Sequence, residues 1–270
     1  MNYCRIPLRV PRELEELLPE DCKLRYAIVD ECFEDFIGPK TWCLGGYLSP
    51  RAYGTNAKGL HQLVLPAPDG YEVDHVGRNS LDNRWRSLRW ATREQNIANK
   101  RGKEGAASAY KGVGRPRDGW IASIKLPHAP KHMTNGNGKI TRHNPSEIYC
   151  ALWYELIARQ SYGGWHTGSF DNVSDAALLG IAIDEGVEVV DAINPGEKSR
   201  KGGCTGKSRI FNTLSPEHWM QRVTEKRRAD RAEMAERQQA AFNYAKIHGL
   251  PGHPVREGEV TLEELQGDMQ

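Results

Sequence analysis

The hydrophobic and polar positions change period several times along the chain, which predicts short strands and helices rather than one large sheet. Residues 25–30, "RYAIVD", alternate apolar and polar positions and predict a strand after a short acidic helix at 12–20. Residues 41–65 predict an antiparallel meander, because Gly-Gly, Ser-Pro and Gly-Thr-Asn separate their apolar runs. A small antiparallel sheet is therefore expected in the N-terminal part.

A strand, a loop, a second strand and a helix are predicted in that order from residue 70 to 101. Strands at 71–75 and 87–92 flank a loop rich in Gly, Asn, Ser and Asp. The tetrapeptide from Thr92 to Gln95 matches a capping box, so a helix is expected to begin there. Asn96 then lies on the first turn of this helix.

A second unit is expected after the small-residue linker 101–108, "RGKEGAAS". Residues 109–126 predict a hairpin with its turn near Arg117-Asp118-Gly119, and 127–145 predict a loop. A helix is expected at 146–160, where the apolar positions share one face.

The C-terminal half predicts three more elements and a linker. Residues 165–170 predict a strand, and 174–185 predict a helix. A basic linker at 196–209 precedes a long helix to about 247, with Ser215 as N-cap. Its mixed charges fit a solvated helix as well as one that contacts DNA or a partner.

Composition and charge extend this α+β picture. The chain has 270 residues, 39% of them hydrophobic, with 27 Gly and 15 Pro, which favours several small domains. It contains no run of about 18 apolar residues, and charge and proline interrupt the N-terminus, so neither a membrane span nor a signal peptide is expected. The expected location is the cytoplasm, where six scattered cysteines without a C-x-x-C pair stay reduced.

The charge is unevenly distributed, although the net charge is only +2. Residues 84–117 carry ten Lys/Arg against two Glu, whereas residues 12–36 carry nine Asp/Glu against three Lys/Arg. A basic run is commonly a solvated face, but here Trp85, Trp90 and Tyr110 lie within it and Trp120 just beyond. This combination favours a nucleic-acid partner.

The stretch "VDHVGRNSLDNRWRSLRWATREQN" resembles the phage-type HNH homing endonucleases, over roughly residues 25–101. Those proteins have a valine, Asp-His, a Gly/Asn loop, Leu-Asp-Asn-Arg, Leu-Arg and a closing Asn on a helix. The resemblance implies a ββα-metal core that holds one divalent ion, Mg²⁺ or Mn²⁺. It makes His75 the general base, and Asp74 and Asn96 the metal ligands.

These residue types suit that chemistry. A neutral imidazole can take a proton from water near physiological pH. The oxygens of Asp74 and Asn96 are hard donors that favour Mg²⁺ or Mn²⁺. An adjacent Asp and His diverge on an ideal strand, so we expect the chain to bend at Val76-Gly77.

The chain departs from the family pattern at Ser87, where the family has its central Asn. A hydroxyl has fewer donor and acceptor sites than an amide, and Asn83 is expected to supply part of the missing bonding. His61 is expected to pack or to tether the loop rather than to bind metal. Asn79, Asp82 and Asn83 are most simply turn residues.

Double-stranded DNA is the expected partner, held by cations around the site. The expected phosphate contacts are Arg84, Arg86, Arg89, Arg93, Lys100 and Arg101. Residues 109–126 and 166–194 resemble the Apetala-type (ethylene-response-factor) DNA-binding domain, with an interruption at 127–164. That resemblance implies that Arg115, Arg117 and Trp120 face DNA, although Trp120 is also a candidate core residue.

Together these features predict three regions: a nuclease region at 1–101, a DNA-binding domain at 108–196, and a linker, helix and tail at 197–270. The expected activity is metal-dependent cleavage of DNA to 5′-phosphate and 3′-hydroxyl ends, with no small-molecule cofactor. A DNA-binding protein with a decayed site competes with this hypothesis, and a nuclease acting on RNA or on a particular nucleic-acid structure is a third.

Overall fold

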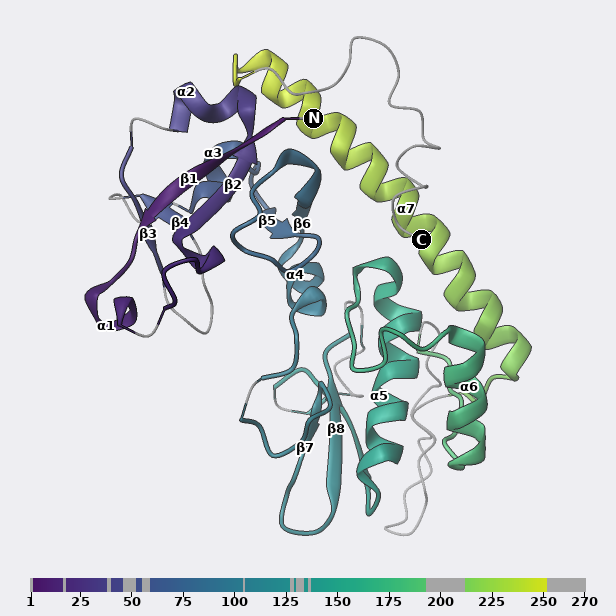
Figure 1. The fold of residues 1–270 in the computed structure, drawn as a ribbon. Helices are drawn as coiled ribbons and strands as arrows, with labels where there is room; N and C mark the ends of the chain where they lie inside the picture. Colours follow the sequence, from purple (N-terminus) through teal and green to yellow (C-terminus); the bar gives the residue numbers. More distant parts are fainter. Residues whose placement is uncertain are drawn as a thin grey trace. The chain divides into compact units, whose positions relative to one another are not determined.

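The computed structural model describes residues 2–16, 18–37, 40–45, 52–54, 59–103, 105–126, 129, 134–135, 137–192 and 212–251. The chain forms two compact units (Figure 1). The first consists of Met1–Asn96 and Ala232–Gln270, and the second of Ile97–Arg231. The basic linker expected at 196–209 and the tail beyond 251 lie outside the described residues.

The first unit opens with a four-stranded sheet in the order β2-β1-β3-β4. The strands are β1 (Tyr3–Arg9), β2 (Tyr26–Asp30), β3 (Trp42–Leu44) and β4 (Ala52–Gly54), with short helices α1 (Arg12–Glu15) and α2 (Glu34–Ile37). The strand expected at 25–30 is confirmed as β2. The prediction of a purely antiparallel sheet is wrong, because β1, which was not predicted, pairs parallel with β3.

The end of the expected meander is also different, because Leu60–Val64 forms helix α3. Leu60 and Val64 are four residues apart and fully buried, which is the spacing of one helix face. The side-chain oxygen of Gln62 accepts the backbone N–H of Gly59 at 3.0 Å and closes the first turn. A run of apolar residues this short did not distinguish strand from helix.

The strand–strand–helix order predicted for residues 70–101 is confirmed. Strand β5 (Glu72–His75) pairs antiparallel with β6 (Leu88–Ala91), and α4 (Arg93–Asn99) follows. Thr92 Oγ1 accepts the N–H of Gln95 at 3.3 Å, and Gln95 Oε1 accepts the N–H of Thr92 at 2.8 Å, so the capping box is formed. Trp85 and Trp90 are buried in the core of this unit.

The loop between β5 and β6 is held by the first sheet. The N–H of Ile28 in β2 donates to the carbonyl of Leu81 at 2.8 Å, and its carbonyl accepts the N–H of Asn83 at 2.8 Å. Asp30 Oδ2 accepts the N–H of Trp85 at 2.6 Å. The N-terminal sheet is therefore the support for this loop.

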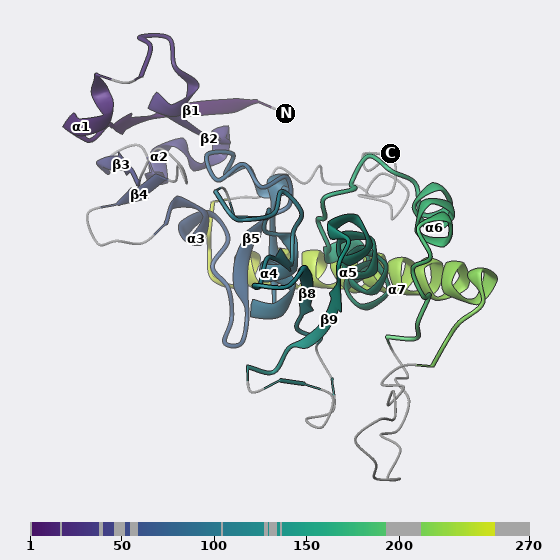
Figure 2. The ribbon, with the colours of Figure 1, turned by 90° about the horizontal axis from the view of Figure 1, so that it is seen from below.

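The second unit contains a three-stranded antiparallel sheet covered by a helix (Figure 2). Strands β7 (Val113–Gly114), β8 (Trp120–Ile124) and β9 (Ile140–Asn144) pack against α5 (Glu147–Tyr162). The predicted hairpin and helix are confirmed. The third strand is β9, so the strand expected at 165–170 is wrong, and 127–164 supplies a strand and a helix rather than an insertion.

The side chain of Arg159 occupies backbone carbonyls in the segment after α5. The guanidinium of Arg159 donates to the carbonyls of Phe170 at 2.6 Å and Val173 at 2.9 Å, which are groups a strand would use for its ladder. Helix α6 (Asp175–Asp184) follows and confirms the helix expected at 174–185, and the side chain of Ser174 caps it by accepting the N–H of Ala177 at 3.3 Å.

The long helix α7 (Pro216–Ile247) confirms the last predicted element. Its residues up to Arg231 belong to the second unit, where Trp219 is fully buried, and those from Ala232 to the first, where Ala241 is buried. The alternative of a solvated helix is therefore wrong for these positions. Among the described residues, none of the helices is long and apolar enough to cross a membrane.

Candidate nuclease site

Asp74 lies in the middle of β5 and is buried. Its Oδ2 accepts a hydrogen bond from Nε of Arg89 at 2.9 Å, and the two residues face each other across the β5–β6 pair. The side chains are only 6% and 9% exposed, so the pair is shielded from water. Arg89 therefore does not lie on the surface where a phosphate contact was expected.

Asn96 lies on the first turn of α4 and is held by Glu72. Its Nδ2 donates to Glu72 Oε2 at 2.5 Å, and Glu72 also pairs with Arg93 at 3.6 Å. Side chains two apart on a strand share a face, so Asp74 lies on the same face as Glu72. Glu72 contacts α4 from that face. The two expected metal ligands, Asp74 and Asn96, therefore lie on elements that face each other, β5 and α4.

His75 ends β5 and makes different contacts. Its Nε2 lies 3.2 Å from Oδ1 of Asn83, and its ring meets that of His61 edge-on with centroids 5.1 Å apart. Burial lowers the pKa of His75, and the hydrogen bond to Asn83 opposes this only in part. The environment therefore favours the neutral imidazole near pH 7.

The chain turns immediately after His75, as expected. Val76 and Gly77 form a turn, closed by the N–H of Arg78 donating to the carbonyl of His75 at 2.9 Å. Arg78 has φ of 60°, a left-handed conformation that costs a side-chain-bearing residue about 1–2 kcal/mol. The turn redirects the chain away from β5 directly beside the imidazole.

Asp82 organises the loop and is more than a turn residue. Its carboxylate binds Arg84 at 2.6 and 2.8 Å and also the hydroxyl of Ser87. Burial raises the pKa of Asp82, but the bonds from Arg84 and Ser87 outweigh it and the pKa is lowered. Ser87 thus supports Asp82, whereas Asn83 contacts the imidazole.

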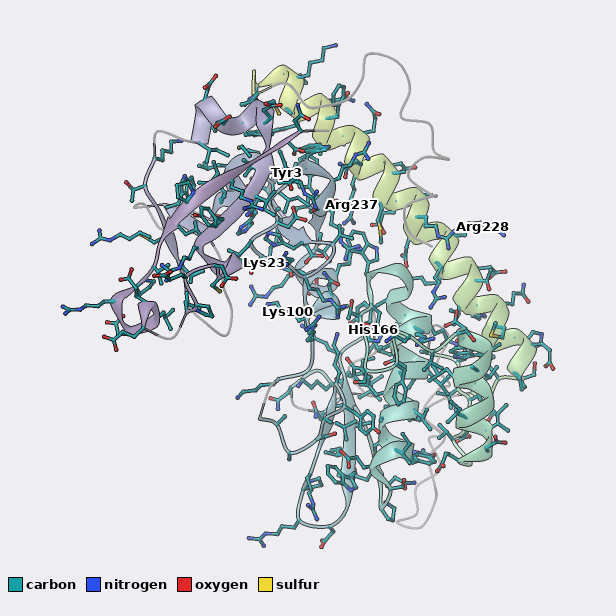
Figure 3. All side chains as sticks on the ribbon, in the orientation of Figure 1. Tyr3, Lys23, Lys100, His166, Arg228 and Arg237 are labelled. Carbon is teal, nitrogen blue, oxygen red and sulfur yellow. The ribbon has the colours of Figure 1, made fainter. Side chains whose placement is uncertain are left out.

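The expected DNA-contacting cations differ in accessibility. Six of them are exposed: Arg86, Arg93, Lys100, Arg101, Arg115 and Arg117. Arg84 is half-buried through its pairing with Asp82. Lys100, which follows α4, is labelled in Figure 3.

Trp120 lies on the face of β8 that packs against α5. It alternates with Ala122 and Ile124, which are buried under that helix, and so shares their face of β8. Arg115 stacks over its ring at 5.2 Å. The opposite face of the sheet carries Ile121 and His143.

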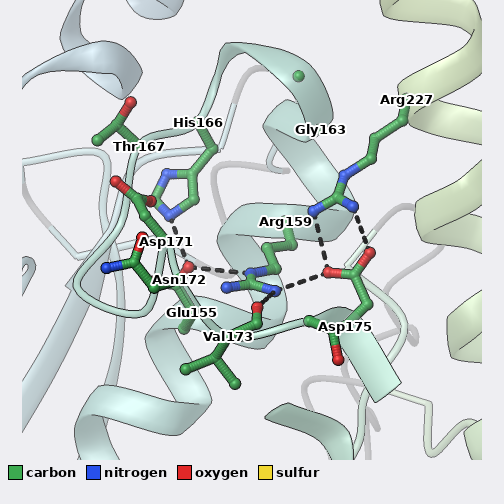
Figure 4. A pocket seen from close by; sticks show the side chains of 12 residues that line it. Glu155, Arg159, Gly163, His166, Thr167, Asp171, Asn172, Val173, Asp175 and Arg227 are labelled. Atoms are coloured by element: carbon green, nitrogen blue, oxygen red, sulfur yellow. Dashed lines mark hydrogen bonds and ion pairs between the residues drawn. The ribbon is translucent and has the colours of Figure 1, made fainter. Parts of the chain in front are cut away.

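The second unit also has a polar cavity of about 430 Å³ that the sequence did not reveal (Figure 4). Glu155 accepts from Arg159 at 3.0 Å and lies 3.3 Å from His166 Nε2. The carboxylate of Asp175 forms ion pairs with Arg159 at 2.7 Å and with Arg227 at 2.5 Å. These groups link α5, α6 and α7 inside this unit.

Sequence reasoning overlooked Glu72 as well as this cavity. Glu72 was detectable as an acid two residues before Asp74 on a predicted strand. Among the residues that the structure describes, no three His, Cys, Asp or Glu side chains gather as a metal site. A site built on Asp74 and Asn96 would rely on an amide oxygen and on solvent or substrate oxygens.

Comparisons with known proteins support the resemblance of this region. Residues 66–98 match a family model described as HNH endonuclease. An uncharacterized HNH endonuclease of Acanthamoeba polyphaga mimivirus is 29% identical over 129 residues, which cover 45% of this chain and 63% of that protein. The chain thus matches less than two thirds of this relative's length. No solved structure is significantly similar.

Proposed function

We propose that this protein is a metal-dependent DNA endonuclease that leaves 5′-phosphate and 3′-hydroxyl ends. The observation that carries the proposal is the ββα unit of residues 72–99, in which His75 lies half-buried beside Asn83 while Asp74 and Asn96 come from facing elements. The matched family description supports nuclease chemistry for the same residues. A role in the homing of a mobile element is part of the proposal.

His75 acts as the general base. The carbonyl oxygen of Asn83 can only accept, so Nε2 of His75 carries the proton in this contact and Nδ1 keeps its lone pair. Nδ1 is then the atom that removes a proton from water as it attacks phosphorus. Asn83 fixes the ring, and His61 packs against it.

Asp74 and Asn96 would hold the divalent ion. Their oxygens are hard donors, which fit Mg²⁺ or Mn²⁺, and Glu72 binds the Asn96 amide nitrogen, which directs the amide oxygen away from Glu72. When bound, the ion stabilises negative charge on the phosphate and on the departing 3′ oxygen. Arg89 holds the carboxylate of Asp74 in place through their ion pair.

Double-stranded DNA is held by the exposed cations, which contact phosphates without reading the sequence. Arg86 and Arg93 lie between His75 and Asn96 in the chain, and Lys100 and Arg101 follow α4. Sequence preference would come from the three-stranded sheet of the second unit, whose β7–β8 hairpin presents Arg115 and Arg117. Trp120 contributes by stacking under Arg115 rather than by touching bases.

The test is plasmid cleavage with Mg²⁺ by the full chain and by His75→Ala, with DNA binding measured in parallel. The variant should lose cleavage and keep binding, because the imidazole supplies a proton acceptor and no phosphate contact. His218→Ala, an exposed histidine on α7, is the matched control and should cut normally. Equal nicking by His75→Ala and the parental protein would remove His75 from the mechanism.

A DNA-binding protein with a decayed site is the second candidate, favoured by Ser87. Its hydroxyl binds Asp82, so the position does not replace the amide that the family has there. This alternative gives salt-sensitive binding and no metal-dependent cleavage. Ser87→Asn distinguishes the two: cleavage that appears only in this variant would identify a decayed site in the parental protein.

A further inference from the structure

Arg237, in the C-terminal part of α7, reaches the β6–α4 junction (Figure 3). Its Nη1 donates to the carbonyl of Trp90 at 3.2 Å and to Oε1 of Gln95 at 2.7 Å. Its guanidinium lies 4.7 Å from the centre of the Tyr71 ring, and its side chain is 14% exposed. Glu233, one turn earlier, pairs with Nη2 and fixes the fork. Arg237 is therefore held on several sides.

The two acceptors of Arg237 lie on either side of the turn into α4. Trp90 is in β6, and Gln95 belongs to the capping box that begins α4. Asn96 follows Gln95 directly, and its N–H donates to the carbonyl of Thr92 at 2.9 Å. A planar guanidinium offers donors in fixed directions, so bonding both acceptors fixes the angle at which α4 leaves β6.

The same face of α7 contacts Arg89, the partner of the other proposed metal ligand, Asp74. Met234, three residues before Arg237, accepts from Nη1 of Arg89 at 3.6 Å, and Arg89 holds Asp74. Residues three apart lie on one helix face. The helix therefore contacts the supports of both Asp74 and Asn96, although it lies far outside the matched motif.

We infer that Arg237 is a positioning residue of the nuclease site, which sets the place of Asn96 relative to Asp74. The inference rests on the proposed function, because it concerns the ion that these two residues hold. Arg237 itself touches neither substrate nor ion. Without the Arg237 guanidinium, α4 can change its angle to β6. Asp74 and Asn96 then no longer lie where both can bind the ion.

The experiment measures Mn²⁺ affinity of the full chain by electron paramagnetic resonance of the free ion, alongside DNA cleavage and thermal unfolding. Arg237→Gln should bind Mn²⁺ about 10- to 100-fold more weakly, the range for loss of a residue that orients a metal ligand. Its KM for DNA should stay near the parental value while kcat falls. Arg228→Gln, an exposed arginine on α7, is the control and should bind and cut normally.

Two variants of the acceptor separate positioning from general destabilisation. Gln95→Glu keeps an oxygen for both Thr92 and Arg237 and should retain Mn²⁺ affinity, whereas Gln95→Ala should lose it as Arg237→Gln does. Unchanged Mn²⁺ affinity in a folded Arg237→Gln would overturn the inference and leave the proposed function intact. A parental protein that neither binds Mn²⁺ nor cuts DNA would overturn both.

Discussion

The buried pair of Asp74 and Arg89 makes a strong prediction about stability. Arg89→Met keeps the length of the side chain but leaves the carboxylate of Asp74 without its 2.9 Å partner. Because both side chains are more than nine-tenths buried, water cannot replace the lost bond, and removal of one partner from such a pair costs about 3–5 kcal/mol. The free energy of unfolding should fall by that amount.

The assay is urea unfolding followed by tryptophan fluorescence, with and without Mg²⁺. A divalent ion at about 100 times its dissociation constant stabilises the folded state by about 2.7 kcal/mol. If Asp74 binds the ion, Mg²⁺ should offset part of the loss in Arg89→Met, and the double variant Asp74→Asn/Arg89→Met should recover stability without responding to Mg²⁺.

Arg84→Met is the matched control, because Arg84 also pairs with an acid in this loop but is 42% exposed. Water can replace part of the interaction that this half-buried side chain loses, so the variant should lose clearly less stability than Arg89→Met. If the unfolding free energy of Arg89→Met lies within about 1 kcal/mol of the parental one, the carboxylate of Asp74 needs no buried partner and the prediction is wrong.

Three further predictions concern other parts of the molecule. Gly112→Ala should lower the unfolding free energy in urea by about 2–4 kcal/mol, because Gly112 has φ of +75° and a Cβ there would lie 2.1 Å from the Tyr154 ring; unchanged stability would contradict this. Burial lowers the pKa of His166 below 6.5, so the unfolded chain protonates first and the free energy of unfolding should fall as pH drops below 6.5. His166→Gln should make the free energy of unfolding less dependent on pH in this range, and an unchanged pH dependence would contradict this. Arg86→Gln should reduce the salt slope of DNA binding by about 1, whereas an unchanged slope would mean that this exposed arginine makes no phosphate contact.

Local signals predicted the order of elements in the candidate site. The capping box at Thr92 and the turn at Gly77 involve neighbours in the chain, so residue types alone indicated them. The ββα unit followed from these signals and the alternation of apolar residues on either side.

Pairings between distant residues were not predictable in the same way. That Arg89 meets Asp74 rather than phosphate depends on the β5–β6 register, which no local pattern specifies. Strand β9 was missed because its residues are mostly polar and only Ile140 is fully buried. The contacts of Arg237 join positions more than 140 residues apart, so only the folded chain reveals them.

The division of the chain has a consequence for synthesis on the ribosome. The first unit needs Ala241, in its second segment, to complete its core, and residues 97–231 are made in between. At about 5–20 residues per second, the ribosome takes about 7–27 seconds to make that stretch. The emerging N-terminal segment thus waits incomplete during translation, and its core remains unfinished until the ribosome has passed Ala241.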